Sequence, residues 1–260
     1  MKSRFLDYII VLLAISYVLI PLSMPIIYSF SVFWQGLFPQ GFTLKWYSFL
    51  YNNPKITPSL TISLIVAISA VILNIIVVVP GVYGINHIPN QRLKYLFRQL
   101  FSILPLIFPP LIIGLGLLQS FNKPPLQISG TIYMVIIAHS LLGFPFMFRN
   151  VDAALRTIDE VTLSEAAASL GANFWQRMRH VIIPNIMPGI LSGSLLVFAI
   201  SFGEFEVTSM VAGFNTRTLP LVLFQQLRDD FRVASAMTAF LVYISLLAFT
   251  SITIIGRKFK

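Results

Sequence analysis

The sequence contains no cysteine and little charge, and these two shortages exclude several classes of protein. Without cysteine the chain forms no disulfide and offers no thiolate as a nucleophile or metal ligand. Charged residues make up only 10% of the 260 residues, whereas soluble domains hold about 25%. With 57% hydrophobic residues and a mean hydropathy of +0.84, the composition indicates an integral membrane protein.

The chain also lacks the sequence patterns of ATP binding and of metal-dependent catalysis. No G-x-x-x-x-G-K-[ST] sequence is present, so the chain does not bind ATP through a phosphate-binding loop. Its three histidines, His87, His139 and His180, do not have a metal-ligand spacing such as H-E-x-x-H. We therefore expect no enzyme activity, cofactor or metal in this chain.

Six apolar stretches are long enough to cross a bilayer core, which takes a helix of about 20 residues. They are 8–29, 60–85, 99–119, 131–149, 186–208 and 237–256. The first is longer than the h-region of a signal peptide, about 7–15 residues, and no clean A-x-A site follows it. We expect an all-α polytopic membrane protein with six transmembrane helices, forming a single domain over residues 1–260.

Two rival transport classes are disfavoured by what the spans do not contain. No aspartate or glutamate lies in the middle of a predicted span and no inverted repeat is visible, whereas a secondary transporter needs coupling-ion sites near the midplane. Nothing resembles the filter sequence of a channel.

The net charge of +9 follows the membrane topology. If the N-terminus is cytoplasmic, twelve of the 18 lysine and arginine residues fall on inside segments, in agreement with the positive-inside rule. The basic charge therefore orients the protein among membrane lipids, with both termini cytoplasmic. It does not indicate a nucleic-acid partner.

The longest polar segment on the inside face, residues 150–185, has the pattern of two short helices joined by a tight turn. Thr162 and Glu165 have the T-x-x-E spacing of a capping box, which predicts a helix over about 163–170. Gly171 follows where a left-handed C-terminal cap is expected, because glycine adopts positive φ without steric cost.

A second capping pattern begins directly after this turn. Asn173 and Gln176 have the N-x-x-Q spacing, which predicts a second short helix that ends near Pro184. The polar side of this helix carries Arg177, Arg179 and His180. From the residues alone, such an amphipathic pair either lies in the membrane interface or meets a cytoplasmic partner.

Polar residues inside the spans are candidates for a solute path, because ionisable groups at membrane depth tend to face a bundle interior or a water-filled cavity. The four candidates are Asn74, His139, Glu204 and Glu206. His139 is either a hydrogen-bonded core histidine, the commoner situation, or a direct solute contact.

Glu204 and Glu206 lie toward the outer end of the fifth span. Because they are two residues apart, they do not face one helical direction unless the helix breaks nearby, which Gly203 would permit. Two acids near the outer mouth would suit a cationic solute. The alternative is a local ion pair with Arg217 or Arg228.

The third span has an irregular composition. Residues 104–117, LPLIFPPLIIGLGL, hold three prolines and two glycines. Irregular backbone at membrane depth is tolerated where it is buried in protein or lines a cavity, which makes this span a further path candidate. Close packing through small residues is the alternative.

The polar inside segment also carries a family pattern. Glu165-Ala166-Ala167, Gly171 and the run Val181-Ile182-Ile183-Pro184 have the spacing E-A-A-x3-G-x9-I-x-L-P, with two conservative departures. This segment resembles the EAA loop of ABC-type importer permeases. Three further stretches are similar to permeases of the spermidine/putrescine, iron(III) and thiamine importer group: GFTLKWY (41–47), AHSLLGFPFMFRNVDAALRTID (138–159) and TRTLPLVLFQQL (216–227).

The resemblance implies a type I (MetI-like) permease of the bacterial cytoplasmic (inner) membrane. In that family two permease subunits pair, and each offers an EAA loop to one of two ATP-binding subunits. An external or periplasmic solute-binding protein delivers the solute, and ATP drives alternating access. ATP and Mg are therefore expected in the partner ATPase, and this chain is expected to be a transport subunit.

Carried over residue by residue, the resemblance assigns Glu165, Ala166, Ala167 and Gly171 to the surface that docks on the ATPase. Glu165 has a second interpretation, in which it only caps its helix. The resemblance favours pairing with a related second permease. Together with the two outer acids it favours a small cationic, polyamine-like solute, with iron(III), thiamine and phosphonate as alternatives.

Overall fold

The fold is built from long apolar helices, as the hydropathy predicts. The computed structural model describes residues 2–34, 36 and 38–257. Within these residues, five helices are long and apolar enough to cross a membrane, and one bent pair makes a sixth crossing if its two halves count as one span. Lys258 and Lys260, two of the twelve cationic residues on predicted inside segments, lie outside the described residues.

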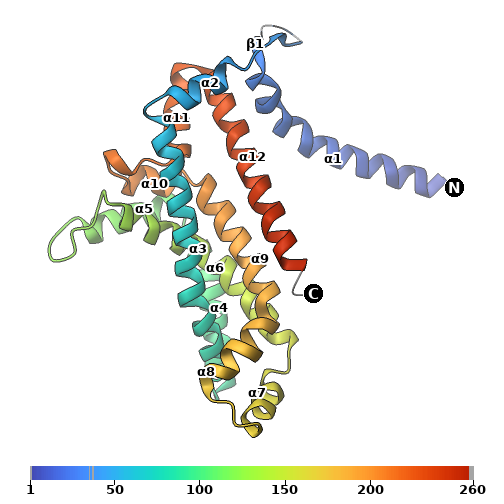
Figure 1. Cartoon of the computed structure of the whole chain (residues 1–260), viewed down its shortest axis with the longest axis vertical. Helices are drawn as coiled ribbons and strands as arrows, with labels where there is room; N and C mark the ends of the chain where they lie inside the picture. The colour runs from blue at the N-terminus through green and yellow to red at the C-terminus, as the bar shows by residue number, and fades with distance from the viewer. Residues whose placement is uncertain (1, 35, 37, 258–260) are drawn as a thin grey trace. The chain divides into compact units, whose positions relative to one another are not determined.

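The observed helices are labelled in Figure 1. The longest are α1 (Lys2–Ser29), α3 (Ile56–Asn86), α6 (Ile132–Thr157), α9 (Ile183–Gly203) and α12 (Phe231–Gly256). By its internal contacts the chain divides into two compact units. The first comprises Met1–Pro58 and Val222–Ile244, and the second comprises Ser59–Leu221 and Ser245–Lys260.

In the first unit, the connection after α1 folds into a small hairpin and a helix. Strand β1 (Ser31–Phe33) pairs antiparallel with β2 (Gln40–Phe42), and α2 (Lys45–Asn52) follows. The indole N–H of Trp46 donates to the carbonyl oxygen of Ser31 at 2.8 Å, and the Arg232 guanidinium lies 4.6 Å from the Trp46 ring centroid. These contacts hold α2 against the start of α12.

In the second unit, α6 packs extensively against α9. Glycines allow this close approach: a Cβ added at Gly193 would lie 2.7 Å from the sulfur of Met147, and one added at Gly143 would lie 2.7 Å from Val197. Small residues serve this purpose in membrane helices generally, because they let backbones approach.

The third predicted span, 99–119, has the irregular backbone expected of its prolines, but it is not a single helix. Helices α4 (Gln91–Ile107) and α5 (Pro110–Phe121) meet at 95°. A residue that precedes a proline is pushed out of the helical region, and Phe108 and Pro109, which each precede one, have ψ values of 126° and 140°. Hydropathy misses the break because the prolines stand in an apolar run.

Each half of this bent pair packs on a different partner. Helix α4 lies along α6, whereas α5 packs on the short helix α10 (Glu206–Val211). A Cβ added at Gly114 of α5 would lie 3.0 Å from Cβ of Met210. The small residue at Gly114 therefore serves close packing, which was the alternative to a pathway role.

The inside segment begins later than the predicted residue 150, because α6 continues to Thr157. Helix α7 (Glu160–Ser169) follows, then a turn and α8 (Phe174–Arg177). Helix α8 does not end near Pro184 as predicted. It runs through a π-helical turn, η1 (Met178–Ile182), into α9.

The π-helical turn explains why Pro184 does not end the helix. The N–H of Ile183 bonds to the carbonyl oxygen of Met178, five residues earlier, so the helix is already widened where the proline ring enters. Pro184 then occupies the first turn of α9, where its missing N–H costs little.

The fifth predicted span, 186–208, ends earlier than predicted, at Gly203, the residue that would permit a break. Helix α9 ends at Gly203, Glu204 is extended with ψ 134°, and α10 begins at Glu206. The 3-10 turn η2 (Phe214–Thr216) and α11 (Leu219–Asp229) complete the connection to α12.

Candidate coupling segment and transport site

The first helix of the inside segment is capped by a different residue from the one predicted. The Asp159 carboxylate accepts hydrogen bonds from the hydroxyl of Thr162 at 2.7 Å and from its backbone N–H at 3.3 Å. These two bonds hold the pKa of Asp159 below its ordinary value, and the bond from the hydroxyl has the larger effect. The predicted Thr162–Glu165 capping box is wrong, because Asp is the stronger cap and starts the helix three residues earlier.

Glu165 consequently lies within α7 and is exposed to solvent. Its capping role is excluded by this placement, which leaves its carboxylate available to a partner. Ala166 is also exposed and Ala167 is half-buried.

The turn after α7 has the predicted geometry. Gly171 has φ +82°, in the left-handed region. The N–H of Ala172 bonds to the carbonyl of Ala167 and the N–H of Gly171 bonds to that of Ala168, which is the Schellman pattern. Two backbone hydrogen bonds therefore fix the turn against the last turn of α7.

The second capping pattern is confirmed. The Asn173 side chain accepts from the N–H of Gln176 at 2.9 Å, and the Gln176 side chain accepts from the N–H of Asn173 at 2.8 Å. We call Glu160–Ile182, which comprises α7, the turn, α8 and η1, the coupling segment.

The tip of the coupling segment exposes large apolar side chains. Leu170 is 90% exposed, Trp175 77% and Phe174 45%, all within one turn of Gly171. Such an exposed apolar group rimmed by polar residues marks an interaction surface. The tip lies at the opposite end of α9 from α10 (Figure 1).

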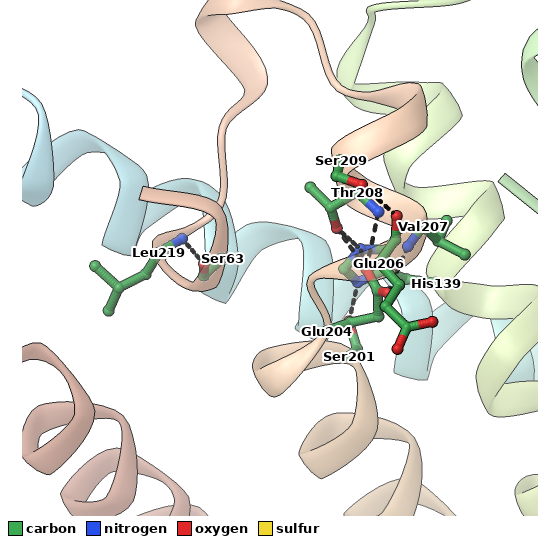
Figure 2. Close-up of polar contacts among 9 residues, drawn as sticks. All are labelled: Ser63, His139, Ser201, Glu204, Glu206, Val207, Thr208, Ser209 and Leu219. Carbon is green, nitrogen blue, oxygen red and sulfur yellow. Dashed lines mark hydrogen bonds and ion pairs between the residues drawn. The ribbon is translucent and has the colours of Figure 1, made fainter. Parts of the chain in front are cut away.

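A cluster of polar side chains lies at the C-terminal end of α9 (Figure 2). The Glu204 carboxylate accepts hydrogen bonds from the N–H of Val207 at 2.7 Å and from the N–H and hydroxyl of Thr208 at 3.0 and 2.6 Å. His139 of α6 lies beside it, with Nδ1 2.7 Å from the Ser201 hydroxyl and Nε2 2.8 Å from the Thr208 hydroxyl.

This set, Glu204, His139, Ser201 and Thr208, is called the elbow cluster. His139 and Thr208 are fully buried and Glu204 is 8% exposed. The Glu204 carboxylate lies 3.4 Å from His139 Nε2. The cluster joins α6 to both sides of the break between α9 and α10, so His139 is placed as a hydrogen-bonded core histidine.

The other two predicted path residues lie outside this cluster. Glu206, at the start of α10, is exposed. Asn74 of α3 is buried, and its Nδ2 lies within hydrogen-bond distance of the Ala70 carbonyl and of the carbonyl and hydroxyl of Ser140. Its Oδ1 is buried without a hydrogen-bond partner. Asn74 therefore joins α3 to α6.

The two arginines considered as partners for the acids have other contacts. The Arg217 guanidinium lies 4.6 Å from the centroid of the Phe214 ring, and that of Arg228 lies 5.7 Å from the centroid of the Phe224 ring. Figure 2 also shows the start of α11 bound to α3, through a 2.7 Å hydrogen bond from the N–H of Leu219 to Ser63.

Sequence reasoning missed several polar residues that the fold brings together. Ser201 and Thr208 are the partners of His139. Near the coupling segment Arg98 is paired with Asp152, and Glu160 accepts a hydrogen bond from Asn86. Charged residues at the ends of apolar helices were the available signal for this second group. Among the described residues, no three His, Asp or Glu side chains gather in a group that could hold a metal ion.

Long apolar helices, a capped helix–turn–helix between two of them and a broken span together define a polytopic membrane protein. The sequence model of one family, described as binding-protein-dependent transport system inner membrane component, matches residues 88–260. The chain belongs to this family. It is the permease subunit of an ABC importer and not an enzyme, since the ATPase of such an importer is a separate subunit.

Two relatives extend the similarity over nearly the whole chain. PhnV of Salmonella typhimurium strain LT2 is 32% identical over 248 residues, covering 95% of this chain and 92% of the relative. The name of PhnV assigns it provisionally to 2-aminoethylphosphonate transport. PotC of Escherichia coli strain K12, a spermidine/putrescine transport system permease, is 28% identical over 243 residues, covering 93% of this chain and 90% of PotC.

Solved structures share the fold. A chain of a bacterial ABC transporter that imports alginate matches with a TM-score of 0.75 and 16% identity, covering 99% of this chain and 96% of that one. A chain of the MetNI methionine ABC transporter matches with a TM-score of 0.63 and 17% identity, covering 78% and 95%. The all-α permease fold predicted from the sequence is thereby confirmed.

Proposed function

We propose that this chain forms half of the solute path of its importer and that the coupling segment docks on a separate ATPase. The complete transporter contains a second, related permease, two ATP-binding subunits that hold ATP and Mg, and an external solute-binding protein. Both termini lie on the cytoplasmic face of the inner membrane.

The exposed apolar tip of the coupling segment carries this proposal. A membrane bundle gains nothing in stability from exposing Leu170 and Trp175, yet a Schellman turn at Gly171 and a capping box hold them in a fixed geometry. A rigid surface of this kind suits a partner that must push on it. Glu165 and Ala166, exposed on α7, lie on the same segment.

Replacing Gly171 by valine tests the docking. A left-handed conformation costs a side-chain-bearing residue about 1–2 kcal/mol, so the Gly171→Val substitution would distort the turn. Gly36→Val is the matched control, because Gly36 also has positive φ, +109°, and lies outside the coupling segment. In the reconstituted transporter we expect Gly171→Val to lose solute-stimulated ATP hydrolysis and Gly36→Val to keep it. Normal stimulation in Gly171→Val would refute docking through this turn.

We further propose that the solute carries a primary ammonium group. The solutes named for PhnV and PotC, 2-aminoethylphosphonate and spermidine or putrescine, share an aminoalkyl group. Glu206 supports this proposal as an exposed carboxylate at the break between α9 and α10. A carboxylate of this kind attracts cations in a partly water-excluded path.

The solute is tested with the partner binding protein. Its thermal stability is measured with putrescine, spermidine, 2-aminoethylphosphonate, methylphosphonate, thiamine and ferric iron, since a bound ligand raises the melting temperature. Stabilisation by an amine, but not by methylphosphonate, supports the proposal and selects between the two amine classes. Stabilisation by thiamine, iron or methylphosphonate alone would refute it.

The orientation is tested by labelling, because the chain has no cysteine of its own. Leu170→Cys introduces a thiol at a 90% exposed position of the coupling segment. A membrane-impermeant thiol reagent should label it in inverted vesicles and not in intact cells. Labelling of intact cells would place the segment outside.

A further inference from the structure

A chain of polar contacts ties the coupling segment to the ends of three membrane helices. Glu160, the first residue of α7, is 3% exposed, and its Oε2 accepts a hydrogen bond from Nδ2 of Asn86 at 3.4 Å. Asn86 is the last residue of α3. Its Oδ1 accepts from Nη2 of Arg98 on α4 at 3.2 Å, and Nε of Arg98 donates to Oδ1 of Asp152 on α6 at 2.9 Å.

We propose that Glu160, Asn86, Arg98 and Asp152, named the polar relay, are positioning residues that pass the movement of α7 to α3, α4 and α6. The inference rests on the docking of the coupling segment proposed above. It goes further, because none of these four residues belongs to the docking surface.

The geometry of Arg98 supports the relay. Its guanidinium uses two different nitrogens for Asn86 and for Asp152, so one rigid planar group holds α3 and α6 at a fixed separation. The Arg98 side chain is 17% exposed and that of Asp152 is 9% exposed. Partly buried pairs of this kind are screened only weakly by salt.

Glu160 is the residue that connects α7 to the helices held by Arg98. Its Oε2 also lies 3.5 Å from Nε2 of His87, and its Oε1 is buried without a hydrogen-bond partner. Glu160 also interacts with the hydroxyl of Tyr83, one turn before the end of α3. Because its neighbours all lie at the end of α3, a shift of α7 away from that end would leave a buried carboxylate unpaired. Helix α7 is therefore expected to move only together with the end of α3 and the helices α4 and α6 that are tied to it.

Asp152 has a second partner that provides a control. Nη2 of Arg156 donates to Oδ2 of Asp152 from the next turn of α6, and the Arg156 side chain is 54% exposed. Arg156 contacts the same carboxylate as Arg98, but within the described part of the chain it forms no hydrogen bond or ion pair with another helix. Arg98→Gln and Arg156→Gln therefore remove one partner each from Asp152, and only the first cuts the relay.

The test uses the complete transporter in proteoliposomes with its binding protein. Three quantities are compared: recovery of the ATPase with the permease, basal ATP hydrolysis, and ATP hydrolysis stimulated by loaded binding protein. We expect Arg98→Gln to keep the first two and to lose the third by about tenfold, within the range of allosteric coupling. Arg156→Gln should stay within about twofold of wild type, as exposed ion pairs do.

Asn86→Ala keeps the proposal testable if Arg98→Gln does not assemble. This uncharged change removes the bridge and leaves the Arg98–Asp152 pair intact, so it should reduce stimulation in the same way. Arg98→Lys should recover only part of it, because an ammonium group lacks the two-nitrogen fork.

Normal stimulation in Arg98→Gln, or in Asn86→Ala if Arg98→Gln does not assemble, would overturn the relay. The docking proposal fails separately, if Gly171→Val is stimulated normally. A stimulated Arg98→Gln beside an unstimulated Gly171→Val would leave docking standing and refute the relay alone.

Discussion

Replacing Glu204 by alanine should loosen the break between α9 and α10. The Glu204 carboxylate accepts from the N–H groups of Val207 and Thr208 and from the Thr208 hydroxyl, at 2.6–3.0 Å. Each buried donor left without an acceptor costs about 1–3 kcal/mol. The two backbone donors alone therefore predict a loss of about 2–6 kcal/mol in the local free energy of opening.

Hydrogen exchange measures this loss directly. The amides of Val207 and Thr208 should lose protection in Glu204→Ala, whereas amides of the coupling segment should not change. Glu204→Gln keeps one acceptor oxygen and should lie between Ala and wild type. Unchanged protection in Glu204→Ala would refute the assignment of Glu204 as the clamp of the elbow cluster.

Glu206→Gln is the matched control for the Glu204 variants, and it also tests whether Glu206 acts in the solute path. Glu206 is exposed, and its carboxylate is not part of the elbow cluster. We expect this change to leave amide protection intact and to reduce uptake of a cationic solute. The two acids, two residues apart, are thus separated into a structural and a transport role by different measurements.

Two further predictions concern packing and capping. Gly193→Ala should lower the free energy of unfolding by about 1–3 kcal/mol, because its Cβ would lie 2.7 Å from the sulfur of Met147. Gly116→Ala is the control and should not lower it, because a Cβ there meets nothing within 4 Å. Thermal unfolding in detergent measures both, and equal melting temperatures would contradict the close packing. Asp159 has a lowered pKa in the folded protein, so its cap stabilises α7 above the unfolded pKa and is lost as the pH falls through the lower, folded pKa. The protection factors of the α7 amides, corrected for the intrinsic exchange rate, should accordingly fall under acid conditions in wild type and stay constant in Asp159→Ala. An equal fall in both would contradict the cap.

Local patterns predicted the turn of the coupling segment well. Gly171 and the Asn173–Gln176 capping box act over three or four residues, and both have the expected geometry. The first cap was assigned wrongly for a local reason too, since Asp159 outcompetes Thr162 and the helix begins earlier. A motif search that stops at the first match misses a stronger cap upstream.

Hydropathy found the spans but not their breaks. The 95° bend between α4 and α5 follows from two adjacent prolines, which a window average treats as neutral members of an apolar run. Pro184 shows the opposite error, because a π-helical turn accommodates a proline that was expected to end its helix.

The sequence by itself determined the membrane class, the approximate positions of the spans and the rigid turn at Gly171. These depend on composition and on contacts between near neighbours. Only the tertiary structure decided what the polar residues do. His139 meets Ser201 and Thr208 across 62 and 69 residues, and Arg98 meets Asp152 across 54. A single sequence does not specify such pairings, because they arise when helices pack and each buried polar group must find a partner.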